Sequence, residues 1–465
     1  MGAPRPDRAA AAALGAALRR LGYDEHALTE QLGEDAYTGG RADVPVAERR
    51  LRETPLAVAI RLLFLERPVA RRDAVAALGA DGVAALERTG LVEARGDELV
   101  PRSRIVPVGE LLLCSDGFTR DAADPPDYVA SYTPTARILD LLTPRPRVRR
   151  ALDVGTGSGI HALLAARHSA HVVAVDVNPK ALAYTALNAA LNGLDNIETR
   201  AGSFFEPVAG ERFDLITCNA PYVVSPESRW IYRDSGFRGD DVTRHIVLAA
   251  ADYLADDGYA ALLGSWLVRE DDEPEARPVA WVGQARAAAW ILVAFESDAL
   301  EHAASWNAHF AGDELAYAAA LDEWTAYLAE LGAAQVAEGA ILLHRGERDR
   351  SIRVDEIDEE TLEPAAAQVR RAFENRERLT GLGREHLLAA RLARALPLRL
   401  ERELGRSGAE LVLGGGTGSA VPATAAAAAL VERLDGKTSL RRLRPDGRGV
   451  SLVRELLELG ALRFV

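Results

Sequence analysis

The chain has 465 residues, enough for about three domains of ordinary size, and its hydrophobic content of 48% provides for several cores. A formal net charge of −14 disfavours a protein that holds nucleic acid by its phosphates over its whole surface. No apolar run reaches the roughly 18 residues that a membrane helix needs. Cys114 and Cys218 lack metal-ligand spacing, so we expect buried free thiols in a soluble, cytoplasmic protein.

Residues 1–115 are predicted to form a helical domain that includes a hairpin. Strands over residues 91–94 and 99–108 flank Gly96-Asp97, which is a hairpin signal. Apolar spacing predicts helices over residues 8–21, 24–32, 56–65, 70–78 and 82–89. The last three helices and the hairpin resemble a winged helix, a fold that binds DNA, binds a protein or caps a substrate, and these roles stay open.

The segment after residue 115 leads into a central domain, which we place at residues 116–346. A helix is predicted over residues 136–142, and Thr133 or Thr135 can cap it. Tyr132 and Thr133 also stand where a lead-in segment can lie over a bound ligand.

Residues 150–179 follow the pattern of strand, glycine turn, helix and strand. Gly155, Gly157 and Gly159 let the backbone pass close to a ligand, where a Cβ would collide. The second strand ends in Asp176, about 20 residues further on, where a carboxylate can hold two ribose hydroxyls. Asp153, at the end of the first strand, would repel a pyrophosphate but suits a cationic amino-acid ligand. The pattern therefore favours S-adenosylmethionine over a dinucleotide.

These residues resemble motifs I and II of the class I S-adenosylmethionine-dependent methyltransferases. The resemblance implies an α/β fold, namely a Rossmann-like sheet of seven strands, the last antiparallel, here with helical or winged-helix modules at both ends. A helix over residues 179–191 and a strand over residues 196–200 come next, and the family places its adenine contacts after that strand. The cofactor, S-adenosylmethionine, is expected to contact Asp153, Gly155, Thr156, Gly157, Gly159, Asp176, Val177, Ser203, Phe204 and Asn219.

A second motif follows a strand predicted over residues 212–218. Asn219-Ala220-Pro221-Tyr222 resembles the N-P-P-Y motif of methyltransferases that modify nitrogen in adenine, in guanine or in a glutamine side chain, with Ala220 in place of proline. The side-chain carbonyl of Asn219 and the backbone carbonyl of Ala220 can both accept an N–H group and so aim the nitrogen lone pair at the methyl group. Pro221 fixes the turn, and Tyr222 offers a flat face to a planar group.

The loop over residues 225–243 is long and polar, which is typical of a functional loop. Its aspartates could bind a cationic amine and Arg233 a carboxylate; the alternative is a solvated loop tied by internal salt bridges. With its lead-in, the loop resembles a branch of actinobacterial methyltransferases that carry an N-terminal helical extension. The expected substrate contacts are Ala220, Tyr222, Tyr232, Arg233 and Asp240.

Residues 347–465 are predicted to form an accessory domain with a winged-helix-like tail, after the sheet is completed by strands over residues 259–267, 289–295 and 340–344. Gly414 to Gly418 are interpreted as a flexible linker. Between residues 431 and 465, eight Arg or Lys stand against five Asp or Glu, a balance that suits a peptide, an RNA or the acidic rest of the molecule. This domain is expected to contain helices over 362–373 and 386–396, and paired strands over 398–404 and 410–413.

We therefore expect an S-adenosylmethionine-dependent N-methyltransferase that acts on an amine or amide nitrogen of a peptide or protein, a peptide natural product included. One alternative is methylation of adenine or guanine in ribosomal RNA. Another is a non-catalytic cofactor-binding module that works through its end domains. The expected catalytic residues are Asn219, Pro221, Tyr222 and Asp234, with Asp234 as the base for an aliphatic amine.

Overall fold

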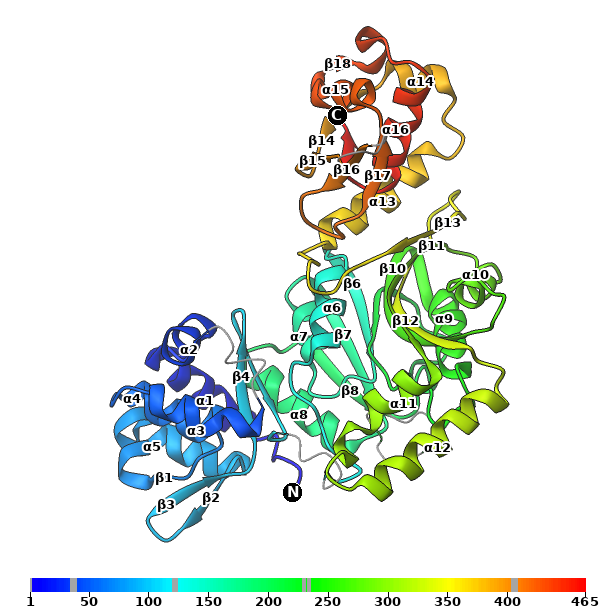
Figure 1. Cartoon of the computed structure of the whole chain (residues 1–465). Coiled ribbons are helices and arrows are strands. Elements are labelled where there is room, and N and C mark those ends of the chain that lie inside the picture. Colours follow the sequence, from blue (N-terminus) through cyan, green and yellow to red (C-terminus); the bar gives the residue numbers. More distant parts are fainter. Residues whose placement is uncertain (1, 34–39, 119–123, 228–230, 232–235, 403–408) are drawn as a thin grey trace.

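The chain folds into three modules that follow one another along the sequence (Figure 1). The computed structural model describes residues 2–33, 40–118, 124–227, 231, 236–402 and 409–465. The N-terminal module lies beside the lower part of a central sheet, and the C-terminal module stands above it (Figure 1). None of the helices in these ranges is both long and apolar enough to cross a bilayer.

The N-terminal module is built from helices, a small three-stranded sheet and a separate hairpin. Its helical segments are α1 Arg8–Leu21, α2 Glu25–Leu32, η2 Arg41–Asp43, α3 Val44–Arg50, α4 Pro55–Ala59, η3 Ile60–Phe64 and α5 Arg71–Thr89. Its strands are β1 Val69–Ala70, β2 Val92–Arg95, β3 Glu98–Pro101, β4 Arg104–Val108 and β5 Leu111–Ser115. The predicted hairpin is confirmed, because β2 and β3 pair antiparallel across Gly96.

One prediction for this module is confirmed and one needs correction. The two helices expected over 70–78 and 82–89 are confirmed, because α5 is interrupted at Gly79, where the backbone is not helical, with φ at 76° and ψ at 164°. The strand expected over 99–108 is two strands, because β3 ends at Pro101 and β4 pairs with β5 instead.

The central module is a sheet covered by helices on both faces (Figure 1). Its strands are β6 Val148–Val154, β7 Ser169–Asp176, β8 Ile197–Ala201, β9 Phe213–Cys218, β10 Leu254–Val268, β11 Ala288–Asp298, β12 Gln335–His344 and β13 Ile352–Glu356. Its helical segments are α6 Pro134–Leu142, α7 Ile160–Ala166, α8 Pro179–Leu191, η5 Glu206–Val208, α9 Asp241–Tyr253, α10 Ala276–Val282, α11 Ala299–Asn307, η6 Ala308–Phe310 and α12 Glu314–Glu330. The predicted α/β class is confirmed.

Within the described residues the sheet has eight strands in the order β13-β11-β12-β10-β9-β6-β7-β8. Seven of them are the expected ones, and β12 runs antiparallel to both β10 and β11. The eighth, β13, pairs parallel with β11 beyond the predicted boundary at residue 346. Valine-rich β7 is buried from Val172 to Val175, as a parallel strand covered on both faces must be.

The C-terminal module packs on the central one through a continuous core that joins Phe373 of its first helix to Tyr259 of β10. Its helical segments are α13 Ala366–Leu379, α14 Arg384–Ala389, α15 Ala425–Glu432, η7 Leu440–Leu443 and α16 Gly447–Glu458. Its strands are β14 Arg391–Arg394, β15 Leu398–Glu401, β16 Ala409–Leu413, β17 Ala420–Ala423, β18 Asp435–Ser439 and β19 Leu462–Phe464.

Two further predictions for this module were wrong. The helix expected over 386–396 stops at Ala389, and the chain continues as β14. The glycine run 414–418 is a turn between β16 and β17 rather than a linker. The Gln368 side chain bonds both the N–H and the hydroxyl of Thr417, which fixes that turn on α13. The predicted pairing of β15 with β16 is confirmed.

Candidate functional site

The strand order reverses between β6 and β9, which lie next to each other at the centre of the sheet. From β6 the chain moves outward through β7 and β8, and it then returns to β9 on the other side. Val154 is aligned with Cys218 in this parallel pair, so the turns that follow the two strands open at the same edge. Open α/β sheets bind ligands at such a reversal, in the crevice outside the carboxyl ends of the strands.

The glycine turn after β6 touches the turn after β9. Gly155, Gly157 and Gly159 all have positive φ, at 66°, 54° and 89°. A Cβ on Gly155 would lie 3.0 Å from Ala220, and one on Gly159 would lie 2.8 Å from the hydroxyl of Thr185. A Cβ on Gly157 would meet no atom within 4 Å, so this glycine borders open space. Gly155 and Gly159 are therefore needed where the backbone passes close to other residues, and Gly157 borders open space.

Asp153 organises this turn from beneath. Its side chain is buried and accepts bonds from the Thr156 hydroxyl at 2.7 Å, the Ala162 N–H at 3.1 Å and the Thr217 hydroxyl at 2.8 Å. Burial raises its pKa to about 6, against the lowering effect of these bonds. Both oxygens of Asp153 are thus bonded within the protein, and its predicted contact with a ligand stays a prediction.

Asp176 lies at the end of β7 and reaches the same turn. One oxygen accepts the Gly157 N–H at 2.9 Å and the other accepts the Asn178 N–H at 2.8 Å. The Val177 N–H also stabilises this carboxylate, so of its roughly four lone-pair positions about one remains for a ligand. Val177 beside it is 53% exposed, which leaves an apolar side chain at the rim.

Ser203 and Phe204 follow β8 at the same edge of the sheet. Phe204 is half-buried and has a φ of 45°, a conformation that is rare for a bulky residue and is often found at functional sites. Its ring meets Phe237 edge-on at 5.8 Å and His245 at 5.4 Å. Phe204 is thus partly buried and packs against the central core.

Asn219 is half-buried at the end of β9, and its side chain makes no hydrogen bond within the described residues. Ala220, packed on Gly155, is 3% exposed. Tyr222 is buried, and its backbone carbonyl accepts a bond from the Ser265 hydroxyl of β10. Burial raises the pKa of the Tyr222 phenol, and the charge of Glu338 adds to this effect. The turn is therefore fixed at both ends while the Asn219 amide stays available.

Glu338 and Glu359 are residues of this site that the sequence did not reveal. Glu338 lies opposite Ser265 in the antiparallel pair of β10 and β12, so both side chains are on the face that bears Tyr222. Burial and the charge of Glu359 raise the pKa of Glu338 to about 7, while a bond from Trp306 opposes the shift. No sequence motif marks Glu338; only the register of β12 brings it here.

The long loop after Tyr222 lies partly outside the described residues. Tyr232, Arg233 and Asp234 fall outside them, so their predicted roles stay predictions. Asp240 is described, and its expected substrate contact needs correction. Its carboxylate is 2% exposed, binds Arg277 through both oxygens at 2.5 and 2.6 Å, and accepts the Leu267 N–H. These bonds tie the end of the loop to β10 and α10.

The lead-in segment caps a helix and also reaches Tyr222 through a hydrogen bond from Thr135, and its predicted position over a ligand stays a prediction. The Thr133 hydroxyl accepts the Ala136 N–H at 3.1 Å at the start of α6, which confirms the predicted cap. Tyr132 donates to Asp140 at 3.1 Å. An earlier part of the segment reaches the β7 edge, where the Asp127 carbonyl accepts a bond from Asn178.

Comparisons with known proteins match two parts of the chain. The family described as "Methyltransferase domain" matches residues 148–249, and the one described as "Domain of unknown function (DUF7059)" matches residues 20–102. The ribosomal protein uL3 glutamine methyltransferase of Bordetella pertussis is 34% identical over 226 residues, which cover 44% of this chain and 72% of that protein.

Two more relatives align with shorter parts of their length. The ribosomal protein uL3 glutamine methyltransferase of Bradyrhizobium diazoefficiens is 35% identical over 216 residues, which cover 40% of this chain and 61% of that protein. The release factor glutamine methyltransferase of Xylella fastidiosa is 36% identical over 130 residues, which cover 25% of this chain and 47% of that protein. The similarity thus spans about half to three-fifths of these two relatives, and it leaves more than half of this chain unmatched.

Proposed function

The chain belongs to the methyltransferase family that includes the ribosomal protein uL3 glutamine methyltransferases, and from that premise we propose that it transfers a methyl group from S-adenosylmethionine to a side-chain nitrogen of a protein or peptide. The observation that carries the proposal is the position of Asn219. Its amide makes no hydrogen bond to the described residues and lies at the end of β9, in a turn whose next residue packs on Gly155. A turn that only closed a strand would have no use for a free, half-buried amide.

The residues at the strand ends fit the cofactor. Gly157 borders open space, Asp176 keeps a lone-pair position for a ribose hydroxyl, and Val177 and Phe204 offer apolar surface for the adenine. The buried negative charge of Asp153 favours a ligand that carries positive charge. When bound, the cofactor supplies a methyl group on a sulfonium, which is already activated for transfer.

The acceptor nitrogen is held, in this proposal, by two carbonyls of the turn that resembles the N-P-P-Y motif. The side-chain oxygen of Asn219 and the backbone oxygen of Ala220 accept its N–H groups, and this orients the lone pair. Pro221 and the bond from Ser265 to the Tyr222 carbonyl keep the turn rigid. Catalysis then comes mainly from position and orientation.

The surroundings of Tyr222 favour a neutral amide over a charged amine as the acceptor. Glu338 has a pKa raised to about 7, and burial also raises the pKa of Glu359. A carboxyl that is protonated near neutral pH can donate a hydrogen bond to an amide carbonyl, whereas it gives no charge to hold an ammonium group. We therefore propose a glutamine-like amide as the acceptor. Tyr232, Arg233 and Asp234 remain candidates for contacts from the loop.

A labelled-methyl assay tests the proposal. The full chain is incubated with S-adenosylmethionine labelled in the methyl group and with separate protein, peptide and RNA fractions from a bacterial lysate. We expect label in protein or peptide, recovered as N-methylated glutamine after enzymatic digestion and as methylamine after acid hydrolysis. Label found in RNA alone would contradict the choice of acceptor.

The Asn219→Ala variant tests the proposed role of the Asn219 side chain in holding the acceptor nitrogen. We expect turnover to fall by about 10²- to 10³-fold, as when one oriented hydrogen-bonding group is lost from an active site. Calorimetry with S-adenosylhomocysteine should give nearly the affinity of the parent chain, because Asn219 is not the main anchor of the cofactor. Unchanged turnover would remove Asn219 from the mechanism.

A further inference from the structure

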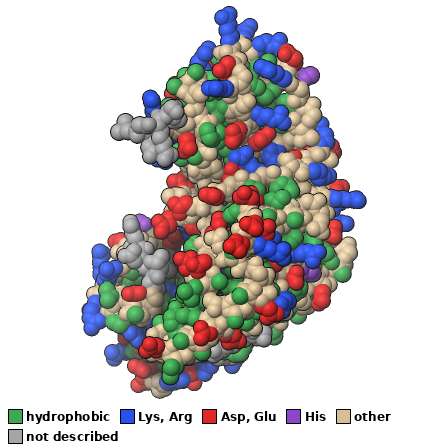
Figure 2. Space-filling view, turned by 45° about the vertical axis from the view of Figure 1, so that its right-hand side comes forward, with side chains coloured by type: hydrophobic (Ala, Val, Ile, Leu, Met, Phe, Trp, Pro, Cys, Tyr) green, Lys and Arg blue, Asp and Glu red, His purple; other side chains and the backbone are tan. Residues whose placement is uncertain are grey.

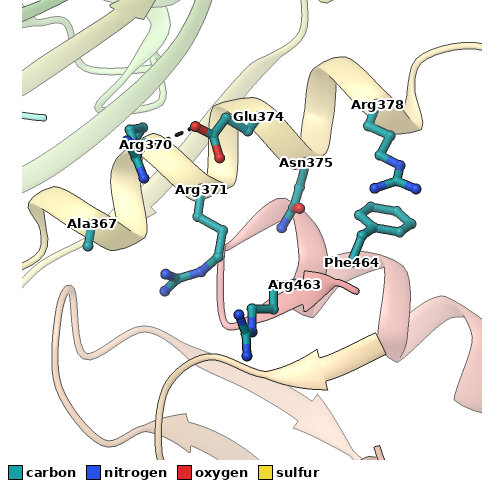
Figure 3. Close-up of a pocket in the computed structure, with 8 residues that line it drawn as sticks. All are labelled: Ala367, Arg370, Arg371, Glu374, Asn375, Arg378, Arg463 and Phe464. Atoms are coloured by element: carbon teal, nitrogen blue, oxygen red, sulfur yellow. Dashed lines mark ion pairs between the residues drawn. The ribbon is translucent and has the colours of Figure 1, made fainter. Parts of the chain in front are cut away.

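The C-terminal module contains a pocket lined by arginines. Its residues belong to segments 367–378 and 463–464, outside the site described above. It has a volume of about 380 Å³ and lies between α13 and β19. Arg370, Arg371 and Arg378 come from α13, and Arg463 comes from β19. Figure 3 shows Arg371 and Arg463 reaching into the same space, with Asn375 and Phe464 beside them.

Most of this positive charge has no counterion. Arg370 pairs with Glu374 at 3.4 Å, but no ion pair joins Arg371, Arg378 or Arg463 to a carboxylate among the described residues. The guanidinium of Arg378 instead lies over the Phe464 ring, 4.0 Å from its centroid. Clustered like charges are costly, so an anion in the pocket would be strongly favoured.

Arg371 contributes an unsatisfied donor. Its Nε donates to the Gly460 carbonyl at 2.6 Å, which fixes the guanidinium, while its buried Nη2 has no hydrogen-bond partner among the described residues. Burial lowers the pKa of Arg371, the charge of Glu374 opposes this shift, and the charges of Arg463 and Arg370 add to it. A buried donor without a partner is rare in native proteins and implies a ligand or a water in its place.

The charge of the whole module points to a polyanion. Residues 362–465 carry 18 Arg and Lys against 12 Asp and Glu, whereas the preceding 361 residues carry 37 against 57. Figure 2 shows Lys and Arg gathered over the upper module and Asp and Glu around the indentation below it. A single small anion would need only the pocket. The positive charge over the rest of the C-terminal module therefore favours a ligand with a chain of phosphates.

We propose that this pocket binds a backbone phosphate of RNA and that the C-terminal module is an RNA-docking module. Planar guanidinium forks match the oxygens of a phosphate with paired hydrogen bonds. Arg371 and Arg463 hold the phosphate, and Arg378 on Phe464 offers a flat surface beside it. RNA is here a docking partner and not the methyl acceptor, so the inference goes beyond the proposed function and does not depend on it.

The test measures fluorescence anisotropy of a labelled 12-nucleotide oligouridylate with the full chain over a series of salt concentrations. In Arg463→Gln and Arg371→Gln we expect about tenfold weaker binding, since each loses a charge-assisted contact. The slope of log affinity against log salt should also become shallower by about 0.7 for each lost contact. Arg463 is exposed, so its variant should fold even if the Arg371 variant does not.

Arg454→Gln is the matched control. Arg454 lies on α16 in the same module and pairs with Glu458 at 3.1 Å, outside the pocket. The Arg454→Gln variant should bind RNA with an affinity within about twofold of the parent chain. The Arg463→Gln variant should keep full affinity for S-adenosylhomocysteine. The proposal is overturned if the parent chain does not bind the oligonucleotide. It is also overturned if the Arg454→Gln and Arg463→Gln variants lose the same amount of affinity for it. It is also overturned if a phosphoserine peptide or inorganic phosphate competes better, per phosphate, than RNA.

Discussion

Two carboxyl groups beside Tyr222, those of Glu338 and Glu359, bind protons more tightly than carboxyl groups in water. For Glu338 the first cause is burial and the second is the charge of Glu359. The ordinary pKa of a glutamate side chain is 4.5, so the folded chain keeps the Glu338 proton at pH values where the unfolded chain has lost it. Folding is therefore penalised as the pH rises from about 4.5 to about 7.

The Glu338→Gln variant should remove this penalty. We expect it to match the parent chain in stability at pH 4 and to be more stable by roughly 2 kcal/mol at pH 8, measured by urea unfolding. Turnover of the parent chain should fall above pH 7, where Glu338 ionises and no longer donates to the acceptor carbonyl, and the variant should lose that inflection. A variant that is less stable than the parent at pH 8 would show that ionised Glu338 is satisfied in the fold.

Sequence patterns located the functional residues at strand ends. They did not locate residues inside a strand, whose neighbours depend on how the strands pair. Asp153, Asp176 and Asn219 stand at strand ends, so a count of residues along the chain places them at one edge. Glu338 lies in the interior of β12, where its neighbour Ser265 is decided by strand register. Register depends on the whole sheet, which explains why Glu338 could not be found from the sequence.

At the scale of elements, the glycine turn and the Asn219 turn act as one unit because Gly155 lies against Ala220. In Gly155→Ala the new Cβ would be 3.0 Å from Ala220, at a φ of 66° that already disfavours a side chain. The turn after β9 must move away. We expect turnover to fall at least about 10²-fold, since a displacement of about 1 Å costs that much in a positioned reaction.

Gly193→Ala is the control for backbone strain. Gly193 has a φ of 69°, and a Cβ there would meet no atom within 4 Å. We expect a loss of about 1 to 2 kcal/mol in the free energy of unfolding and unchanged turnover. If the two variants lost the same amount of turnover, the contact between Gly155 and Ala220 would not couple the glycine turn to the Asn219 turn.

The elements themselves were predicted well where periodicity was strong. α1 and α8 have the predicted bounds, because Asp7 caps the first, while Asn178 caps and Pro179 begins the second. β13 was missed although Ile352 to Asp355 alternate apolar and charged side chains, as a half-buried strand does, because five residues just past the predicted domain boundary were not assigned to the sheet. The turn over 414–418 was misread because its anchor, Gln368, lies 49 residues away in the chain.

At the scale of the whole molecule, the N-terminal module and α8 share one core. Tyr184 and Leu187 of α8 are buried in the N-terminal cluster. Lys180 of α8 pairs with Asp116 at 2.7 Å, and both side chains are almost completely buried. Asp116 also accepts the Tyr184 hydroxyl at 2.9 Å and the Val129 N–H at 2.8 Å. The N-terminal module thus supports the helix that follows Asp176.

Removing one partner of this buried pair should destabilise the chain strongly. We expect Lys180→Met to lower the free energy of unfolding by about 3 to 5 kcal/mol, because Asp116 is left buried without its counterion. The Lys180→Met/Asp116→Asn double variant should recover part of this loss. Arg95→Ala, which breaks the exposed pair with Glu93, should cost at most about 1 kcal/mol. If Lys180→Met and Arg95→Ala unfold at the same urea concentration, the buried pair does not join the modules.

The most direct measurement is a crystal structure of the full chain with S-adenosylhomocysteine. The account predicts that a ribose hydroxyl binds Asp176, that the ligand passes over Gly157, and that its sulfur points toward the Asn219 side chain. A ligand bound elsewhere, or an Asn219 amide turned away and bonded within the protein, would contradict the account.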